Sequence, residues 1–459
     1  TKQLFRLNVP PERHTRHNEY RLLSPQSLFE FSTGLLFFQF STKYMQTIDV
    51  AVVGASAAGL FAAIHAGRTA RLLGRPIRIS AFDGARKLGA KILVAGGGRC
   101  NVTHWRVTEQ DFSGSSAPAI RKVLGRFTEL DTATFFEQLG VSLKREETGK
   151  LFPASNSART VLNALLREAQ ALGVELIYPA RIRRIDRHES GGFHLQGDCE
   201  PLLANRVILC TGGKALPKSG SDGEGFALAC HLGHTLVEPI IPALVPLVLE
   251  DGHWITALSG LTLPAELFLK SGAGKRLVSF ASSTLCTHFG MSGPSVLDIS
   301  RHYLRSQDTD PHTQLLINWL PGFTNESLDE LFLAPGSGGP LSLLRRHLPD
   351  RLARQLATLA GIDDSRNVPR ERRRLLATLT TATVLPVIRD RGFTFAEATA
   401  GGVPLSEVRL ETMESRVCPG LSLAGEVLDV DGRIGGFNFQ WAWSSGFVAG
   451  THAAKALMS

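Results

Sequence analysis

The chain of 459 residues is 43% hydrophobic and 20% charged, a composition typical of a soluble globular protein. Its length exceeds one typical hydrophobic core, so we expect two or three domains. The six cysteines are scattered and form no C-x-x-C pair, which argues against a disulfide framework or a metal site and favours a reducing cytoplasm. The net charge of +8 is compatible with a phosphate-rich partner but identifies none.

The first 44 residues differ from the rest of the chain, with mixed polarity and no clean periodicity. Their most apolar run, 34–40, is far shorter than the roughly 20 residues that span a bilayer, and it lacks the order of a signal peptide. Met45 stands directly before the first predicted strand. We therefore expect residues 1–44 to be an extension outside the fold, and we expect a cytoplasmic protein without membrane attachment.

A strand–helix–strand unit follows. A β-branched run at 48–53 reaches a glycine turn, and a small-residue helix is expected to continue to Gly74. The second predicted strand, 77–83, ends on a carboxylate. This arrangement is typical of proteins that bind the ADP half of a dinucleotide. The alternative is an ordinary turn of the same kind in another α/β protein.

Each position in this unit has an expected role. Gly54 permits the tight turn, the first helical amides face a pyrophosphate, and Gly59 allows the helix to pack closely on the strand. Asp83 is expected to accept hydrogen bonds from ribose hydroxyls. Ser56 stands where the middle glycine of the motif is usual, and its hydroxyl can itself bond a phosphate.

The run 88–103 follows the expected ribose-binding acid directly. Its three consecutive glycines, 96–98, bring bare backbone up to a ligand, as a flat ring or a phosphate requires, although a flexible loop is the alternative. Arg99 and Asn101 supply donors. Cys100 is a candidate proton donor or redox thiol, with simple packing as the more common role of a lone cysteine.

The middle of the chain changes in character. A buried strand at 206–210 leads into Thr211 and Gly212, which is typical of large flavin folds, and the loop 220–225 offers further amides or simply starts a helix. Alternating, proline-punctuated runs from Ile240 to Ile299 predict an antiparallel sheet or small barrel. The periodicity then becomes helical from Leu328 to Thr381.

After Phe393 glycine-punctuated strands return, and the chain ends in a helix expected from about Asn438 to Leu457. The fold class is therefore α/β, with a nucleotide-binding domain built from both chain ends and β-rich and helical insertions. The expected boundaries are 45–235 and 391–459 for the two parts of that domain, 236–325 for the β-rich insertion and 326–390 for the helical insertion.

The C-terminal segment gives a second strong signal. A strand ends at the step Gly425-Glu426, and the pair Gly435-Gly436 then opens a helix. Glu426 or Asp429 is expected to bond cofactor hydroxyls. The helix that begins near Asn438 would aim its positive dipole at the charge on N1 and C2=O of a reduced flavin. A solvated acidic loop is the alternative.

Two further features are candidates for substrate or RNA contact. His288 lies in a turn-rich segment after a strand, where a structural role is the more common one. Nine arginines lie between 345 and 374, among them Arg372, Arg373 and Arg374, and either a solvated helix surface or a contact face for phosphates would explain them. No metalloprotease, P-loop or nucleophile-elbow motif occurs.

Over about residues 47–454 the chain resembles the BaiN/RdsA family, bacterial FAD-binding oxidoreductases with a two-part inserted domain. The resemblance rests on seven blocks: 54–59, 91–103, 150–155, 211–225, 287–294, 399–403 and 425–443. It implies bound FAD, a β-barrel-like and a helical subdomain inserted into the FAD domain, and reduction by NAD(P)H. The family includes a ribosomal RNA dihydrouridine synthase and amine-oxidising relatives. Ser56 and His104 depart from the family pattern, and His104 leaves the substrate open.

We thus expect an FAD-dependent oxidoreductase, an NAD(P)H-dependent reductase that passes hydride from flavin N5 to an unsaturated small molecule. The alternatives are a ribosomal RNA dihydrouridine synthase, an amine oxidase-like flavoprotein and a non-catalytic nucleotide-binding module. No second dinucleotide unit is evident, so nicotinamide would dock transiently. The residues expected to hold FAD are Gly54, Ser56, Ala57, Ala58, Gly59, Asp83, Lys91, Gly97, Gly98, Arg99, Asn101, Thr211, Gly212, Gly425, Glu426, Asp429, Gly435, Gly436 and Asn438.

Overall fold

The computed structural model describes residues 45–189, 191–334, 338–363 and 368–458. By its contacts the chain divides into two units, 1–44 and 45–459. The extension expected at 1–44 lies outside the described residues.

The main sheet runs in the order β20-β21-β22-β10-β1-β2-β7, with β9 paired to β10 and β8 paired to β9. Its central strand β1 pairs in parallel with β10 and β2, and β10 pairs in parallel with β22. The prediction that both chain ends build the Rossmann-like domain is therefore confirmed. The strands are β1 (Gln46–Val53), β2 (Ile79–Phe82), β7 (Glu175–Ile177), β8 (Ile182–Arg187), β9 (Phe193–Gly197), β10 (Leu202–Leu209), β20 (Val408–Arg409), β21 (Glu414–Ser415) and β22 (Leu421–Leu423).

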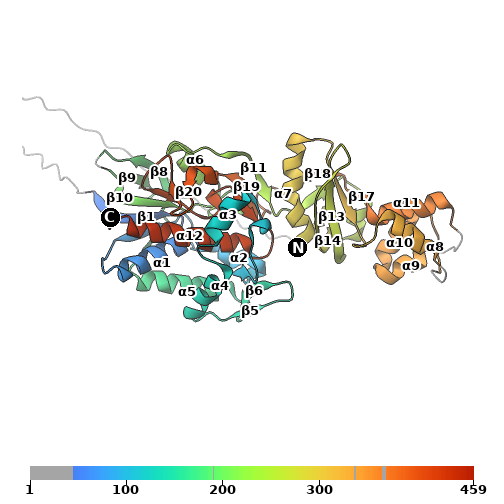
Figure 1. The fold of residues 1–459 in the computed structure, drawn as a ribbon, viewed down its shortest axis with the longest axis horizontal. Coiled ribbons are helices and arrows are strands. Elements are labelled where there is room, and N and C mark those ends of the chain that lie inside the picture. Colours follow the sequence, from blue (N-terminus) through green and yellow to red (C-terminus); the bar gives the residue numbers. More distant parts are fainter. Residues whose placement is uncertain (1–44, 190, 335–337, 364–367, 459) are drawn as a thin grey trace, which may run out of the picture. The chain divides into compact units, whose positions relative to one another are not determined.

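Two helices from opposite ends of the described chain, α1 (Ala57–Leu72) and α12 (Phe437–Lys455), pack side by side, as the blue and red helices of Figure 1 show. Glycines allow this close approach. A Cβ atom on Gly450 would lie 2.0 Å from the carbonyl oxygen of Ala62, and one on Gly446 would lie 2.7 Å from that of Ala58. The helix pair thus fixes the first turn of α1 against the C-terminal segment.

The β-rich insertion is an antiparallel sheet in the order β17-β16-β13-β14-β15-β12-β18. Along β13 exposed and buried residues alternate, as expected for a sheet with one covered face. The helices α8–α11 share one hydrophobic core with it. The bounds are β12 (Leu247–Leu249), β13 (Thr262–Lys270), β14 (Arg276–Thr287), β15 (Gly290–Ser292), β16 (Gln314–Asn318), β17 (Thr383–Val384), β18 (Val387–Asp390), α8 (Asn325–Leu333), α9 (Pro340–His347), α10 (Asp350–Leu359) and α11 (Arg370–Thr381).

The expected strand pattern up to Ile299 is wrong in its last part. Helix α7 (Pro294–Thr309) begins there, after Gly293 with a φ of +90°, and proline in its first turn favours a helix start. Strand β11 (Val237–Ala243) pairs with β19 (Ala398–Gly402), so the chain enters and leaves the inserted region on neighbouring strands. This pairing is the arrangement that an insertion into the nucleotide-binding domain requires.

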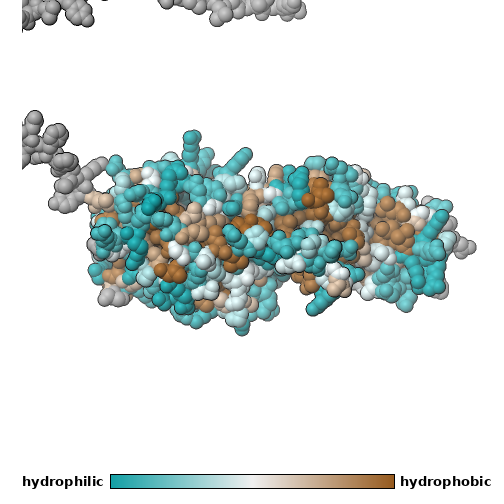
Figure 2. Space-filling view, turned by 90° about the horizontal axis from the view of Figure 1, so that it is seen from above, coloured by the Kyte–Doolittle hydropathy of each residue, from teal (hydrophilic) through white to brown (hydrophobic). Residues whose placement is uncertain are grey.

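The surface in Figure 2 carries hydrophilic side chains over most of the face drawn, with smaller apolar areas between them. Among the described residues, no helix has both the length and the apolar character that crossing a bilayer demands. The same part of the chain contains no cluster of His, Cys, Asp or Glu side chains able to hold a metal ion.

A buried histidine links two segments that are distant in sequence. His234 Nδ1 lies 2.7 Å from Glu407 Oε2, and its Nε2 lies 2.9 Å from Ser415 Oγ. The same serine oxygen accepts hydrogen bonds from the backbone N–H groups of Val417 and Cys418. Although these residue types also form hydrolytic triads, this serine is fully buried and its oxygen is occupied, so the network is structural.

We expect Ser415→Ala to lower the free energy of unfolding by about 2 kcal/mol, because it leaves buried donors without an acceptor. Urea denaturation of the variant and of Ser282→Ala, an exposed serine, would measure this. Equal midpoints for the two variants would contradict the structural role.

Candidate functional site

A cavity of about 680 Å³ opens at the carboxyl ends of the parallel strands. It is lined by segments that follow β1, β2, β10 and β22, namely 54–58, 83–84, 210–212 and 425–426. Ligands of open α/β sheets bind at this edge because the loops there converge. The cavity therefore has the position and size of a cofactor site.

Most residues that the sequence nominated lie along this cavity. They are Gly54, Ser56, Ala57, Ala58, Asp83, Lys91, Gly97, Arg99, Asn101, Thr211, Gly212, Gly425, Glu426, Gly435, Gly436 and Asn438. Gly59 and Gly98 do not line it. A Cβ atom on Gly59 would lie 1.7 Å from the Gly54 carbonyl oxygen, so this glycine serves the packing of α1.

The interpretation of Asp429 as a cofactor contact needs correction. Its side chain is buried away from the cavity, and its backbone is tied to neighbouring segments. The N–H donates to the carbonyl of Val403 and the carbonyl accepts from the N–H of Ser115, both at 2.8 Å. Glu426 lies within the short 3-10 turn Gly425–Val427 and lines the cavity, whereas Asp429, two residues after that turn, does not.

At one end of the cavity, the turn after β1 is held by Asp83. This carboxylate accepts hydrogen bonds from the N–H groups of Ala55 at 2.9 Å and Ala85 at 2.8 Å. Burial raises the pKa of Asp83, and the two backbone donors oppose that rise. Asp83 therefore shapes the phosphate turn itself, and a ribose would meet its remaining lone pairs.

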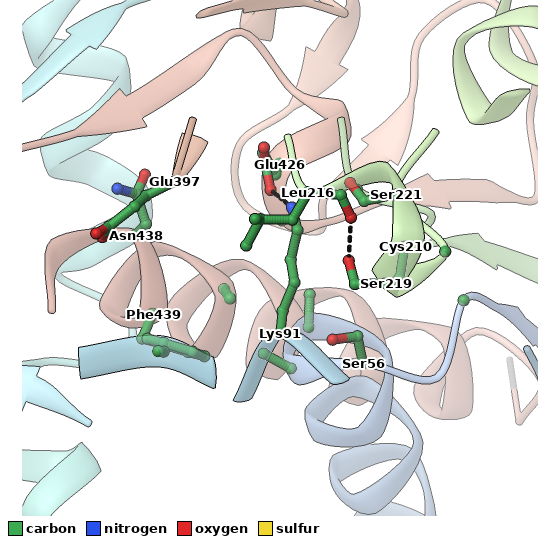
Figure 3. A pocket seen from close by; sticks show the side chains of 18 of the residues that line it. Ser56, Lys91, Cys210, Leu216, Ser219, Ser221, Glu397, Glu426, Asn438 and Phe439 are labelled. Atoms are coloured by element: carbon green, nitrogen blue, oxygen red, sulfur yellow. Dashed lines mark hydrogen bonds and ion pairs between the residues drawn. The ribbon is translucent and has the colours of Figure 1, made fainter. Parts of the chain in front are cut away.

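The middle of the cavity is crossed by an ion pair. Lys91, on α2 (Ala90–Gly98), lies with Nζ 2.6 Å from Glu426 Oε2. In Figure 3 this pair lies between Ser56 on one side and Asn438 with Glu397 on the other. The pair joins the N-terminal and C-terminal parts of the domain across the site.

Three buried oxygen atoms along the cavity have no hydrogen-bond partner within the described ranges: Glu426 Oε1, Asn101 Oδ1 and Thr211 Oγ1. Buried polar atoms normally find partners, so such atoms indicate a missing donor. A ligand rich in hydroxyl and N–H groups supplies those donors. The cavity residues consequently fit an extended dinucleotide.

At the other end, α12 begins after Gly436, as expected. The side chain of Asn438 is occupied: its Nδ2 donates to the Gly432 carbonyl at 2.9 Å and its Oδ1 accepts from the Gly432 N–H at 2.8 Å. Asn438 thus fixes the glycine loop at the cavity wall. The positive end of the helix dipole remains directed toward this end of the site.

The structure does not support a chemical role for Cys100. The thiol is fully buried in the hydrophobic core and does not line the cavity. Burial raises its pKa to about 12. A thiol without access to the cavity cannot deliver a proton there, so the packing interpretation is the correct one.

Two neighbouring residues are also engaged in the protein itself. Arg99 pairs with Glu146 at 2.6 Å and its guanidinium lies 4.0 Å from the centre of the Phe152 ring. Both ring nitrogens of His104 lie against backbone carbonyls, at 2.9 and 3.0 Å, and the ring packs on Phe437. His104 does not line the cavity, so its departure from the family pattern is a packing feature.

The candidate RNA contacts lie outside the cavity. His288 is exposed in the turn between β14 and β15. Arg373 is mostly buried and pairs with Asp329 at 2.6 Å, and Arg372 donates to the Gly361 carbonyl at 2.7 Å. Arg373 is therefore held in an ion pair within the protein, whereas Arg372 and Arg374 are exposed, and Arg374 lies 3.7 Å from Asp329. A contact between these arginines and a phosphate stays a prediction.

We expect Arg373→Glu to lower the free energy of unfolding by about 2 kcal/mol, because it sets a second carboxylate against Asp329. Arg374→Glu should cost less than about 1 kcal/mol, because an exposed pair is weak. Urea denaturation distinguishes the two. An equal loss in both variants would contradict the assignment of Arg373 as structural.

Several residues that line the cavity were not predicted from the sequence. Lys150 and Glu397 carry charge into the site, and Phe395 lines it with an exposed ring. Lys150 opens a block that carries the family resemblance, and Glu397 stands two residues before another. Their position beside those blocks is the signal that was available.

The model of the HI0933-like protein Rossmann domain matches residues 48–452. The chain is 32% identical to the 3-dehydro-bile acid delta(4,6)-reductase of Clostridium scindens, over 88% of this chain and 99% of that protein. It is 32% identical to the ribosomal RNA dihydrouridine synthase of Escherichia coli, over 87% and 96%. A solved 3-ketosteroid-delta4-(5alpha)-dehydrogenase from Rhodococcus jostii is 16% identical over 91% and 99%, with a TM-score of 0.46.

Proposed function

Because the chain belongs to the HI0933-like family of FAD-dependent oxidoreductases, we propose that it reduces a carbon–carbon double bond conjugated with a carbonyl group, with NAD(P)H as the electron source. The names of the two relatives support this chemistry. A 3-dehydro-bile acid with 4,6 double bonds and a uridine each present a double bond conjugated with a carbonyl. Reduced FAD supplies the hydride that such a reaction needs.

The cavity residues would hold FAD in an extended form. The backbone at 54–58 and the start of α1 would receive the pyrophosphate. The free oxygens of Glu426, Asn101 and Thr211 would accept hydroxyl and N–H groups along the cofactor. The flavin ring would lie between the glycine loop of α2 and the start of α12. The three buried oxygens without partners are the observation that carries this placement.

The absorbance spectrum of the purified protein, followed anaerobically after addition of NADH or NADPH, tests the proposal. We expect a flavin band that bleaches with one of the two donors and returns when a conjugated enone is added. A flavin band that stays oxidised with both donors would contradict the reductase, and peroxide release with an amine would indicate an amine oxidase. Absence of flavin after reconstitution with FAD would contradict the cofactor.

A uridine in ribosomal RNA is the second candidate substrate, supported by the relative from Escherichia coli and by the basic helical insertion. Reoxidation of the reduced protein by a uridine-containing ribosomal RNA fragment, compared with a steroid 4-en-3-one, separates the two classes. RNA binding through phosphates should weaken as salt rises, and Arg374→Glu should flatten that dependence.

A further inference from the structure

Glu397 is fixed in place but its carboxyl group is free. Its backbone N–H donates to the Leu244 carbonyl at 3.2 Å, and it stands directly before β19 between two buried alanines. Its side chain is open to the cavity, at the end occupied by Asn438 in Figure 3. Within the ranges that the structure describes, no hydrogen bond or ion pair engages this carboxyl group.

Each of the other acids that line the cavity has a partner within the protein. Asp83 accepts two backbone N–H groups, and Glu426 pairs with Lys91. Asp222 and Glu224 both pair with Arg181, at 2.5 and 2.8 Å. Glu397 differs from these acids because its carboxyl group lies at the cavity wall and has no hydrogen-bond or ion-pair partner among the described residues.

Lys150 is the complementary cation. It begins strand β6 (Lys150–Pro153), lines the same cavity, and forms no ion pair with another described residue. Confinement between the cavity walls raises the pKa of Glu397, the charge of Lys150 opposes that rise, and Asp298 adds to it. Asp298 itself accepts from the N–H of Ile434 at 2.7 Å, so it is not the free acid of this group.

We propose that Lys150 binds the carbonyl oxygen of the substrate and that Glu397 donates the proton when a conjugated double bond is reduced in this cavity. This inference rests on the proposed function. Both side chains line the same cavity, and they form no ion pair with each other.

The reaction balances with these two groups. The hydride forms a C–H bond at the carbon β to the carbonyl, the π bond breaks, and its electron pair moves to the carbonyl oxygen. The Lys150 ammonium stabilises the negative charge there. The electron pair then returns to the α carbon, which takes the proton of the Glu397 carboxyl group. NAD(P)H supplies the two electrons, and water in the cavity reprotonates the carboxylate.

The FAD-loaded protein, reduced anaerobically with dithionite and mixed with a steroid 4-en-3-one or a uridine oligonucleotide, tests Glu397. We expect Glu397→Gln to slow reoxidation by the acceptor by about 100-fold, with the flavin spectrum unchanged. Glu250→Gln, which alters an exposed acid away from the cavity, is the matched control and should retain the wild-type rate.

Binding of p-chlorophenol to the oxidised protein, followed by flavin absorbance, tests Lys150 without turnover, because the phenolate resembles the charged carbonyl oxygen. We expect Lys150→Met to weaken phenolate binding by about 10-fold or more, since a charge-assisted hydrogen bond is lost. The control is Lys144→Met on the neighbouring strand β5 (Leu143–Arg145).

The outcomes separate this inference from the proposed function. If the wild-type protein reoxidises with an acceptor while Glu397→Gln matches its rate and Lys150→Met matches its phenolate affinity, the assignment of these two residues is overturned and the reductase stands. If the wild-type protein reoxidises with neither acceptor, the proposed function fails, and this inference fails with it.

Discussion

Gly54→Ala is expected to weaken the binding of FAD by at least roughly 100-fold. Gly54 has a φ of +98°, and a Cβ atom there would lie 2.4 Å from the carbonyl oxygen of Cys210. That oxygen belongs to backbone that cannot move freely, because the N–H of Cys210 donates to Val53 at the end of the β1–β10 pair. Because the turn must shift to relieve this backbone strain and overlap, the free energy of FAD binding should weaken by at least about 3 kcal/mol, or roughly 100-fold in affinity.

Quenching of flavin fluorescence on binding gives the dissociation constant, and melting with and without FAD separates lost binding from lost folding. Two glycines serve as controls. Gly74 follows α1 and Gly173 follows helix α5 (Ala158–Ala171); neither lines the cavity, and both have a positive φ with no atom within 4 Å of an added Cβ. Alanine at either position should lower the free energy of unfolding by only about 1 kcal/mol. Wild-type affinity in Gly54→Ala would contradict the placement of the pyrophosphate.

The parts of the fold that the sequence predicts well are those with redundant signals. Strand β1 ends in the uninterrupted buried run 50–53, and it is followed by a glycine turn and a small-residue helix, so three independent patterns agree. The start of α12 is similar, with a glycine pair before an apolar helix. These elements form the cavity, which is why most nominated cofactor residues lie along it.

The errors come from tertiary contacts that local patterns do not contain. Glu426 and Asp429 are acids that follow the same strand, and the sequence does not show which of them lines the cavity. The 3-10 turn that contains Glu426 determines this in the structure. In the sequence Arg373 is one of three adjacent arginines, and nothing local distinguishes it from the other two. In the structure it pairs with Asp329 on α8. Cys100 follows a glycine loop at the cavity, yet its own side chain turns into the core. Glu397 belongs to no sequence motif, and only the structure shows that it lines the cavity with a carboxyl group that has no partner among the described residues.

The ion pair between Lys91 and Glu426 should matter as a unit for the binding of FAD. Both side chains are about one-fifth exposed, at 18% and 20%, and the second oxygen of Glu426 is free for the ligand. We expect Glu426→Ala to weaken FAD binding by about 3 kcal/mol, because it removes an acceptor and leaves Lys91 without its anion. Lys91→Met should cost about 1 kcal/mol, because it leaves the acceptor in place.

Glu426→Ala leaves the Lys91 ammonium without its anion, and this penalty disappears when Lys91 is also replaced. The double variant should therefore lose less FAD binding free energy than the sum of the two single losses. We expect a coupling energy of about 1 kcal/mol in a double-mutant cycle of FAD dissociation constants. The pair Arg68–Glu168 offers a matched control, since it has a 2.7 Å contact and similar exposure but lies away from the cavity. The same cycle on that pair should leave FAD affinity unchanged. Strictly additive losses at Lys91 and Glu426 would mean that the two residues contact the cofactor independently, and the ion pair would then have no part in shaping the site.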